Sequence, residues 1–349
     1  MQKVSEDTQR RINFLFRCDV GKKNEIGTGH LVRSITLAKK LNNDNKFKAQ
    51  DTIFLINYDS EFSFVKELIK KNNFTLKFIN LYNAPPNSIQ ELEIIKELNP
   101  RISIFDRIKT NKTFILKLQR NKLKTVLIDD KGSGLAEADL SICPIFFHRP
   151  LKKKIYKGFK YIFFSELKRR KVLVRQKVTL ITLVFGGYDK RKLFNFFYKN
   201  IKKLGSCYSF NLIFGFEKDK FDKKIILSLS QSKNINLFFR PRNYSDIIQD
   251  SDIGIVSGGL TLIEFLSVGI PTIALPQYNH QYITIKKLQQ LRCTTLGSKD
   301  YKLDWNYFEK KFFKVLNNYN LRKKMSINAK KIIDSKGKER VSKLISKIL

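Results

Sequence analysis

The sequence has few of the residues that build disulfide frameworks and metal clusters. Its 349 residues include four cysteines and three histidines, and the cysteines lie far apart with no CxxC pair. This spacing suggests neither a zinc site nor disulfides, and reduced thiols in a cytosol fit it best. We therefore expect a cytoplasmic protein without a metal site.

Long hydrophobic runs are also missing. The longest run, around residues 178–185, is much too short to span a bilayer. The first residues, MQKVSEDTQRR, have no apolar core of a signal peptide. We predict that the chain has no transmembrane segment.

Acidic residues are few beside basic ones. The chain has 31 Asp and Glu and 68 Lys and Arg, which gives a formal net charge of +37. Such a charge would attract nucleic acid, anionic lipid or a polyphosphate-bearing substrate. The lysines are scattered through almost every segment, and there is no zinc-finger spacing or RNP-like motif. We therefore favour solvated basic faces over a nucleic-acid surface, and expect a monomer with no specific nucleic-acid partner, compatible with peripheral membrane contact.

Short β-rich runs alternate with segments of helical period, as in parallel sheets with crossover helices. The pattern restarts near residue 178, which predicts an α/β fold of two Rossmann-like parallel-sheet domains facing a cleft, residues 1–165 and 166–349. The tail, residues 304–349, is expected to form two helices, of which the last could cross back onto the first domain. The strand candidates are residues 12–16, 52–56, 75–79, 102–105, 125–128, 140–143, 178–185, 210–214, 235–239, 253–256 and 271–275.

The loop after the first strand contains Asp19 and ends in Gly27-Thr28-Gly29-His30, just before a predicted helix. Glycines at 27 and 29 let the backbone approach a ligand closely, and the helix start favours an anion. His30 could accept a proton from water, and Arg33, on the same side of the first turn, could pair with a phosphate or with an acid. The alternative is an ordinary turn in which His30 caps the helix.

Two glycine pairs follow strands of the second series. Gly186-Gly187 comes after its first strand, and Gly258-Gly259 leads into a helix whose start suits a diphosphate. Glu264 lies in the first turns of that helix, within reach of ribose hydroxyls. The open alternative is a capping box, in which Thr261 and Glu264 merely satisfy the helix start.

Polar residues at two other strand ends are further candidates. Asn279, His280 and Gln281 follow a strand at the expected cleft edge, where they would contact a uracil, a sugar or only water. Asp129-Asp130 ends a strand of the first series. Because no other carboxylate lies at ligand spacing, we interpret this pair as solvated turn acids.

The motifs, in this order and spacing, resemble the UDP-sugar hydrolases of pseudaminic (nonulosonic) acid biosynthesis. In that family an R-x-D and a G-x-GH-x-x-R follow the first strand. The matching blocks are RCDVGKKNEIGTGHLVRSITLAKKL, IDDKGSGLAEADLSICP, FGGYD and SDIGIVSGGLTLIEFLSVGIPTIALPQYNHQ. The last block is shared more loosely with glycosyltransferases of the GT-B fold.

The resemblance implies two GT-B-like domains with a UDP-sugar in the cleft. It implies hydrolysis at the anomeric carbon, which releases UDP and a free amino-deoxy sugar without a metal or other cofactor. By position, His30 would be the general base for water. Gly259 and Thr261 would face the diphosphate, Glu264 the ribose, and Asn279 or Gln281 the substrate near the domain edge.

One motif departs from the family pattern. The family commonly shows D-x-Y after the fourth strand, where this chain has Asp106-Arg107-Ile108. The loss of this tyrosine would mean a changed sugar, or loss of hydrolase activity with the nucleotide site retained. A GT-B glycosyltransferase, which uses an acceptor hydroxyl in place of water, is the first alternative function. A non-enzymatic basic nucleic-acid-binding protein is the second.

Overall fold

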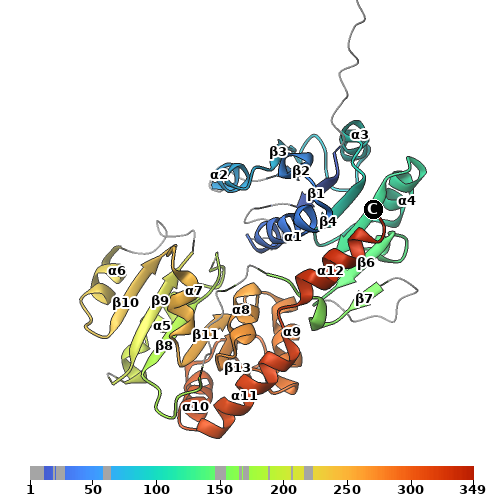
Figure 1. Ribbon diagram of the computed structural model, residues 1–349. Coiled ribbons are helices and arrows are strands. Elements are labelled where there is room, and N and C mark those ends of the chain that lie inside the picture. The colour runs from blue at the N-terminus through green and yellow to red at the C-terminus, as the bar shows by residue number, and fades with distance from the viewer. Residues whose placement is uncertain are drawn as a thin grey trace, which may run out of the picture. The chain divides into compact units, whose positions relative to one another are not determined.

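The computed structural model describes residues 12–18, 20, 28–57, 64–145, 155–164, 167, 173–187, 189–205, 207–215 and 223–349. The chain divides into two compact units, shown with their elements in Figure 1. The first unit comprises Met1–Phe163 and Lys336–Leu349, and the second comprises Phe164–Ser335.

The first unit contains a seven-stranded parallel sheet in the order β3-β2-β1-β4-β5-β6-β7. Its side chains alternate between two buried faces: Phe14 and Phe16 of β1 pack in one core cluster, and Leu15 packs in the other. Burial on both faces explains why the central strands β1, β2 and β4 are largely apolar. The strands are β1 (Phe14–Cys18), β2 (Thr52–Ile56), β3 (Thr75–Phe78), β4 (Ile102–Asp106), β5 (Lys124–Ile128), β6 (Leu140–Cys143) and β7 (Ile155–Lys157).

Helices cover the two faces of this sheet. The apolar stripe of the first helix, including Leu31, Ile35 and Leu41, packs in the same cluster as Phe14, and helices from the middle of the unit supply Ile95 and Phe114 to the other. The helices are α1 (Gly29–Asn45), α2 (Phe64–Lys71), α3 (Ile89–Leu98), α4 (Lys112–Arg120) and α12 (Gly337–Ser346), with short 3-10 turns η2 (Ala49–Asp51), η4 (Ser133–Ala136) and η5 (Phe159–Tyr161).

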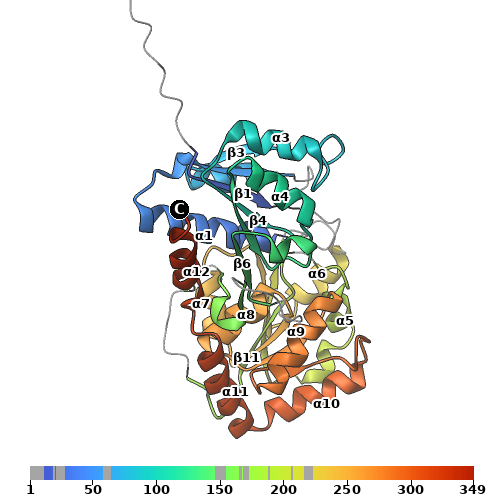
Figure 2. The same cartoon turned by 90° about the vertical axis from the view of Figure 1, so that its right-hand side faces the viewer.

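The last helix, α12, belongs to the first unit. Figure 2 shows it beside α1, where Val341 and Ile345 join the core cluster of that face. Ser342 Oγ donates a hydrogen bond to Asp44 at 2.6 Å, and Asn45 donates to Ser346 Oγ at 3.0 Å. The predicted second domain ran to residue 349, so the structure differs from it in assigning these final residues to the first unit.

The second unit repeats the architecture with a six-stranded parallel sheet in the order β10-β9-β8-β11-β12-β13. Its strands are β8 (Leu180–Val184), β9 (Ser209–Phe214), β10 (Ile235–Phe239), β11 (Ile253–Ser257), β12 (Thr272–Leu275) and β13 (Thr295–Leu296). Its helices are α5 (Leu193–Tyr198), η6 (Ile201–Leu204), α6 (Lys223–Ser230), α7 (Tyr244–Gln249), α8 (Leu260–Val268), α9 (Asn279–Gln290), α10 (Trp305–Leu316) and α11 (Tyr319–Ile332).

All of the predicted strands form, with end points shifted by at most two residues. The short strands β7 and β13 were not predicted. The tail contains three helices, α10, α11 and α12, in place of the expected two. Asp304 caps α10 and Asn318 caps α11, each accepting a hydrogen bond from a backbone N–H three residues on, so a new helix begins within a stretch that reads as continuous.

Each sheet reverses its strand order beside its first strand. In the first unit the reversal lies between β1 and β4, and in the second it lies between β8 and β11. Ligands of open α/β sheets bind outside the carboxyl ends of the strands at this point. The residues that follow these four strands are therefore the first place to examine for a site.

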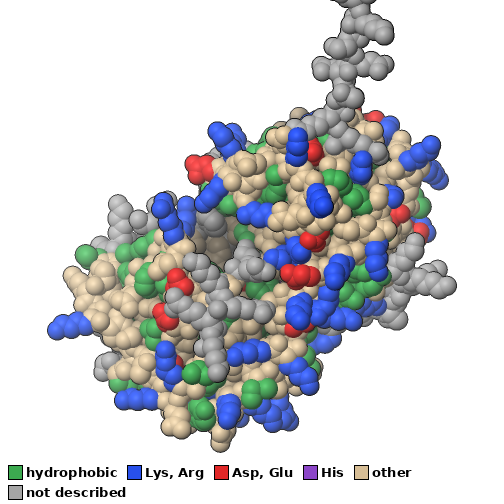
Figure 3. All heavy atoms as spheres, in the orientation of Figure 1, with side chains coloured by type: hydrophobic (Ala, Val, Ile, Leu, Met, Phe, Trp, Pro, Cys, Tyr) green, Lys and Arg blue, Asp and Glu red, His purple; other side chains and the backbone are tan. Residues whose placement is uncertain are grey.

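Two surface properties bear on the predicted partners. No helix in the described part of the chain is both long and apolar enough to cross a membrane. Lysine and arginine side chains are spread over the face of each unit that Figure 3 shows, as the scattered sequence positions indicate.

The start of α12 gives a test of how firmly this helix is attached. A Cβ added at Gly337 would lie 1.9 Å from the carbonyl oxygen of Ile162, which is backbone and has little freedom to move. Gly337→Ala should therefore push α12 away and destabilise the first unit by about 1–3 kcal/mol. Differential scanning calorimetry measures this as a lower unfolding temperature.

Lys343→Ala is the matched control, because Lys343 is exposed on the same helix. It should leave the unfolding temperature of the first unit unchanged. Equal stability of Gly337→Ala and the parent protein would contradict the close packing of α12.

Candidate functional site

His30 and Asp106 form a close pair at the reversal point of the first sheet. His30 is the second residue of α1, and Asp106 is the last residue of β4, opposite Cys18 at the end of β1. His30 Nδ1 lies 2.6 Å from Asp106 Oδ1. The His30 side chain is 19% exposed, whereas the Asp106 side chain is fully buried, so the ring connects the buried carboxylate with the surface.

Arg33, one turn along α1, holds Asp106 in place. Its Nε donates to Asp106 Oδ2 at 2.6 Å, its Nη2 donates to Asp106 Oδ1, and its Nη1 donates to Asp129 Oδ2 at 2.7 Å. Ser34 Oγ adds a hydrogen bond to Asp106 at 3.2 Å. Sequence reasoning left Arg33 to pair with a phosphate or with an acid, and in the structure it binds two buried carboxylates.

These contacts determine the protonation of the pair. Burial alone would raise the pKa of Asp106, but the charge of Arg33 and the hydrogen bonds from Arg33 and His30 hold it well below its usual range. An ionised carboxylate only accepts hydrogen bonds, so His30 Nδ1 carries the proton. In the neutral ring Nε2 then keeps its lone pair, and none of the described residues forms a hydrogen bond with it.

The acids at the end of β5 are structural, which corrects their interpretation as solvated turn acids. Asp129 and Asp130 are 2% and 1% exposed. Asp129 binds Arg33 and accepts a hydrogen bond from the backbone N–H of Ile145, while Asp130 accepts from Thr110 N and Oγ1. Both acids cross-link loops that the sequence places far apart, which their local spacing does not reveal.

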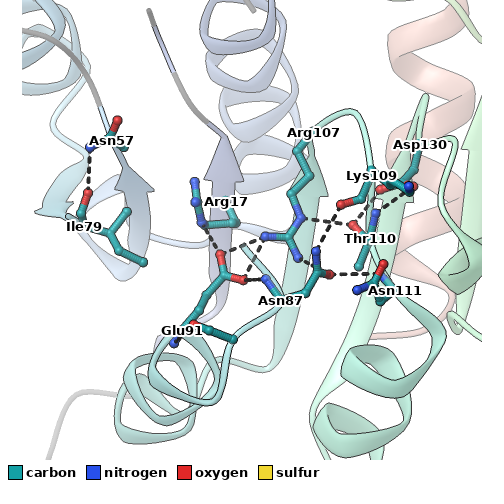
Figure 4. Close-up of polar contacts among 11 residues, drawn as sticks. Arg17, Asn57, Ile79, Asn87, Glu91, Arg107, Lys109, Thr110, Asn111 and Asp130 are labelled. Atoms are coloured by element: carbon teal, nitrogen blue, oxygen red, sulfur yellow. Dashed lines mark hydrogen bonds and ion pairs between the residues drawn. The ribbon is translucent and has the colours of Figure 1, made fainter. Parts of the chain in front are cut away.

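A second buried ion cluster lies at the same edge of the sheet and was not predicted. Figure 4 shows Glu91 between Arg17, whose Nε donates to it at 2.6 Å, and Arg107, whose Nη1 donates to both carboxylate oxygens at 2.8 Å. Burial would raise the pKa of Glu91, but the charges of Arg107 and Arg17 hold it below its ordinary value. Arg107 also lies over the ring of Phe105, 4.9 Å from its centre.

This cluster gives Arg107 a structural role in the segment that departs from the family motif. Arg107 Nε donates to Thr110 Oγ1 and Nη2 donates to Asn87, so the guanidinium joins the loop after β4 to the start of α3. An arginine in the strand FLFRC, beside apolar neighbours, is the sequence signal that a buried acid must lie nearby. Nothing in the local sequence identifies Glu91 as that acid.

The glycine pairs of the second unit meet at its reversal point. A Cβ on Gly186, whose φ is +83°, would lie 3.5 Å from Ser257 Oγ and 3.9 Å from Thr261 Oγ1. A Cβ on Gly259 would lie 3.4 Å from Gln281 Nε2. The loops after β8 and β11, the start of α8 and the start of α9 therefore converge, as the sequence motifs predict for one site.

Gln277 ties these loops together and was missed by sequence reasoning. Its Oε1 accepts from Lys190 N at 2.7 Å, and its Nε2 donates to the carbonyl of Phe185. Gln281 Oε1 in turn accepts from Gln277 N at 2.9 Å. Gln281 is therefore buried in the loop framework, whereas Asn279 is exposed as the first residue of α9.

Glu264 does not belong to a capping box, so this alternative interpretation is wrong. The N-cap of α8 is Gly259, no side chain caps the helix, and Glu264 is its fifth residue. Glu264 Oε2 accepts a hydrogen bond from Tyr244 Oη at 2.8 Å. Burial raises the pKa of Glu264 to about 7, and the bond from Tyr244 acts in the opposite direction.

The predicted site residues also include Asp19, Gly27, Gly29 and Gly187. Asp19 and Gly27 lie outside the described residues, while Gly29 is the first residue of α1 and Gly187 follows Gly186 in the loop after β8. Within the described ranges, no group of three His, Cys, Asp or Glu side chains is arranged to hold a metal ion.

Comparisons with known proteins place the chain among distant relatives. No protein-family model matches it. It is similar to the uncharacterized protein MJ1062 of Methanocaldococcus jannaschii, with 25% identity over 272 residues, which are 72% of this chain and 54% of that protein; the chain thus spans about half the length of this relative. It is also similar to the spore coat polysaccharide biosynthesis protein SpsG of Bacillus subtilis, with 20% identity over 336 residues, 92% of this chain and 94% of SpsG.

Solved structures confirm the fold. MurG of Acinetobacter baumannii matches with a TM-score of 0.66 and 14% identity, over 96% of this chain and 99% of that one. The spinosyn rhamnosyltransferase SpnG, complexed with thymidine diphosphate, matches with a TM-score of 0.61 and 13% identity, over 95% and 99%. These matches show the predicted two-domain Rossmann-like α/β fold of the GT-B type, and at such identities they show the fold alone.

The hydrogen bonds from the guanidinium of Arg33 to Asp106 and Asp129 can be tested by substitution. Arg33→Lys keeps the positive charge, but a single ammonium group cannot bond both Asp106 and Asp129 as the guanidinium does. We expect a loss of about 2 kcal/mol in the free energy of unfolding, because a buried charged hydrogen bond is lost. Urea denaturation followed by circular dichroism measures it.

Arg120→Lys, at an exposed position in the last turn of α4, is the control and should unfold at the parental urea concentration. If Arg33→Lys were as stable as this control, the hydrogen bonds from Arg33 to Asp106 and Asp129 would not stabilise the first unit, and the prediction would be wrong.

Proposed function

We propose that the chain hydrolyses a UDP-linked acetamido-deoxy sugar at the anomeric carbon and releases UDP and the free sugar. The observation that carries the proposal is the His30–Asp106 pair at the start of a helix, a histidine with an oriented Nδ1–H and an Nε2 to which none of the described residues is hydrogen-bonded. Such a histidine is equipped to act as a general base.

In the proposed reaction His30 Nε2 takes a proton from water as the water oxygen bonds to the anomeric carbon. The bond between that carbon and the diphosphate oxygen breaks, and its electron pair leaves with UDP. Asp106 keeps the ring in the required tautomer and stabilises the imidazolium that forms, as a carboxylate does for the histidine of a catalytic triad. Arg33 acts through Asp106 and does not contact the substrate.

We assign the UDP portion to the second unit. Gly186 and Gly259 leave backbone accessible beside Thr261 Oγ1 and the amino end of α8, which suits a diphosphate. Glu264, one turn further along α8, is the proposed partner of the ribose hydroxyls. Asn279, exposed at the start of α9, and Gln281 are proposed to contact the substrate, with Gly187 and Gly258 as close backbone neighbours.

The comparisons support this proposal through the names of the similar proteins. SpsG is named for spore coat polysaccharide biosynthesis, and SpnG is a rhamnosyltransferase solved with a nucleoside diphosphate. We therefore propose a place for this chain in nonulosonic acid or surface polysaccharide biosynthesis. No metal or other cofactor takes part in the proposed step.

A GT-B glycosyltransferase that uses a UDP-sugar donor is the second candidate. The observation that favours it is Ile108, which stands where the hydrolase family has a tyrosine. The same His30 Nε2 would then deprotonate an acceptor hydroxyl in place of water. A basic nucleic-acid-binding role ranks below both enzymatic candidates, because it gives the His30–Asp106 pair no function. Strong, salt-sensitive binding to RNA would favour it.

The discriminating experiment incubates the pure protein with a panel of UDP-N-acetylated sugars in the absence of an acceptor. Hydrolysis predicts equal amounts of UDP and free sugar from at least one donor. Release only after acceptors are added identifies a transferase, and a protein that binds no UDP-sugar excludes both candidates.

His30→Asn tests the proposed general base. Asparagine can still donate a hydrogen bond toward Asp106, so folding and UDP affinity should stay parental. Turnover with water should fall by about 10² to 10⁴-fold, the usual contribution of a positioned base. Steady-state UDP release and calorimetric UDP titration separate these two quantities.

Lys39→Asn, on an exposed position of α1, is the matched control and should turn over at the parental rate. Parental UDP release by His30→Asn on a confirmed substrate would make His30 structural and the proposed mechanism wrong.

Glu264→Gln tests the ribose assignment. The amide keeps the size of the side chain but removes the negative charge that strengthens a bond from a ribose hydroxyl. Because no side chain caps α8, the unfolding temperature should change little while the dissociation constant for UDP rises about tenfold or more. Unchanged UDP affinity would remove Glu264 from the site.

A further inference from the structure

Asp106 and the residues on either side of it face opposite sides of the first sheet. Asp106 bonds Arg33 of α1, whose apolar stripe packs in one core cluster. Phe105 packs in the other core cluster with residues of α3 and α4, and the guanidinium of Arg107 lies over its ring. The chain at the end of β4 is therefore held from one face through Asp106 and from the other through Arg107.

Glu91 of α3 joins β4 to β1 on the face opposite α1 (Figure 4). Its Oε1 accepts hydrogen bonds from Arg17 Nε at 2.6 Å and from Arg107 Nη1 at 2.8 Å. Arg17 lies near the end of β1, in register with Phe105 of β4, and Arg107 follows the last residue of β4. One carboxylate thus links the two strand ends between which the sheet reverses its order.

The start of α3 fixes the position of the Glu91 side chain. Ser88, the N-cap residue, accepts a hydrogen bond from Glu91 N at 3.1 Å, and Asn87 N donates to Glu91 Oε2 at 2.7 Å. These reciprocal bonds resemble those of a capping box. Because Asn87 Oδ1 also accepts from Arg107 Nη2 at 3.2 Å, the helix start and the loop after β4 form one bonded unit.

We propose that Glu91 is a positioning residue for the His30–Asp106 pair. By holding the ends of β1 and β4 together from the far face of the sheet, it keeps Asp106 within hydrogen-bond distance of the His30 ring. The inference rests on the proposed function, which makes His30 the general base. A shift of the strand end would weaken the bond to Nδ1 and release the ring from its tautomer.

Removal of the negative charge of Glu91 would set two buried cations against each other. The side chains of Arg17 and Arg107 are 0% and 5% exposed, and a nitrogen of each lies within 2.8 Å of the same carboxylate oxygen. Without the carboxylate the two guanidinium groups repel each other in surroundings that screen charge poorly. The strand ends then separate, and Asp106, the residue before Arg107, moves with them.

The first measurement is the tautomer of the His30 ring, observed by ¹⁵N NMR at a pH where the ring is neutral. The chain contains three histidines, so the spectrum is simple, and His30→Asn identifies the signals of His30. The parent should show the Nδ1–H form, because Asp106 accepts from that nitrogen. In Glu91→Gln the released ring should also populate the Nε2–H form, so that its two nitrogen signals move toward each other.

The second measurement separates catalysis from binding. We expect the kcat of UDP release to fall by about 10- to 100-fold in Glu91→Gln, as for other misplaced catalytic groups. The dissociation constant for UDP should stay parental, because the proposed UDP site lies in the second unit. Glu91→Asp keeps the carboxylate on a shorter side chain and should restore part of the lost kcat.

Arg107→Gln tests the same link without leaving two cations unbalanced. It removes the bonds from β4 to Glu91, while Arg17 and Glu91 keep their ion pair. We expect the same change of tautomer as in Glu91→Gln. This variant answers the question even where Glu91→Gln does not fold.

Two controls separate positioning from stability. Glu93→Gln removes an exposed carboxylate from the same helix and should keep the parental tautomer and kcat. Gly337→Ala, which is expected to destabilise the first unit at the packing contact of α12, should keep both values at temperatures where it is folded.

The outcomes distinguish this inference from the proposed function. A parental tautomer in both Glu91→Gln and Arg107→Gln, or an equal change in Gly337→Ala, overturns the positioning role and leaves the proposed function standing. A change of tautomer in the two variants of the link, in a protein that releases UDP from no donor, supports the positioning role and overturns the proposed function.

Discussion

The first unit depends on one buried ion pair network, in which Arg33 joins Asp106 at the end of β4 to Asp129 at the end of β5. These two strands are neighbours in the sheet and Arg33 belongs to α1, so a single guanidinium joins three elements. Removing two carboxylates and an arginine from water is costly unless every charge is bonded, and here both oxygens of Asp106 are used. The result is a rigid carboxylate under His30, and that rigidity is what a positioned base requires.

The two units use the same topology with different chemistry at the reversal point. In the first unit side-chain ions fill the edge of the sheet: Arg33 with its acids, and Glu91 with Arg17 and Arg107. In the second unit glycines and amides take that place, with Gln277 and Gln281 bonding loop backbone. The ions of the first unit hold one imidazole beside its carboxylate, whereas the amides of the second unit bond the backbone of the loops that carry the glycine pairs. The proposed roles of the two units, a general base in the first and a diphosphate site in the second, correspond to this difference.

The fold was predictable because burial on both faces makes parallel strands into continuous apolar runs. β7 and β13 escaped prediction because they are only three and two residues long. The positions of the candidate site residues were predictable in outline, since the glycine pairs stand directly after strands and His30 stands at the start of the helix that follows the first strand. Its partners were not, because Asp106 is 76 residues from His30, and Asp129 is 96 residues from Arg33. The capping-box alternative for Glu264 is wrong because the helix begins at Leu260, which puts Glu264 one turn too far along.

The distribution of basic residues explains why the net charge of +37 gives little functional information. The buried cations named above are arginines, whose planar guanidinium bonds several acceptors at once, and Arg322 likewise donates to the last carbonyls of α10. Lysines in ion pairs, such as Lys96 with Glu93 and Lys112 with Glu137, lie where solvent reaches them. Such exposed pairs contribute little to stability, and their charges are hydrated and screened by salt. The chemistry of the proposed site therefore depends on a few buried arginines and the acids that they bond. The excess lysines determine the net charge of the surface and do not take part in this site.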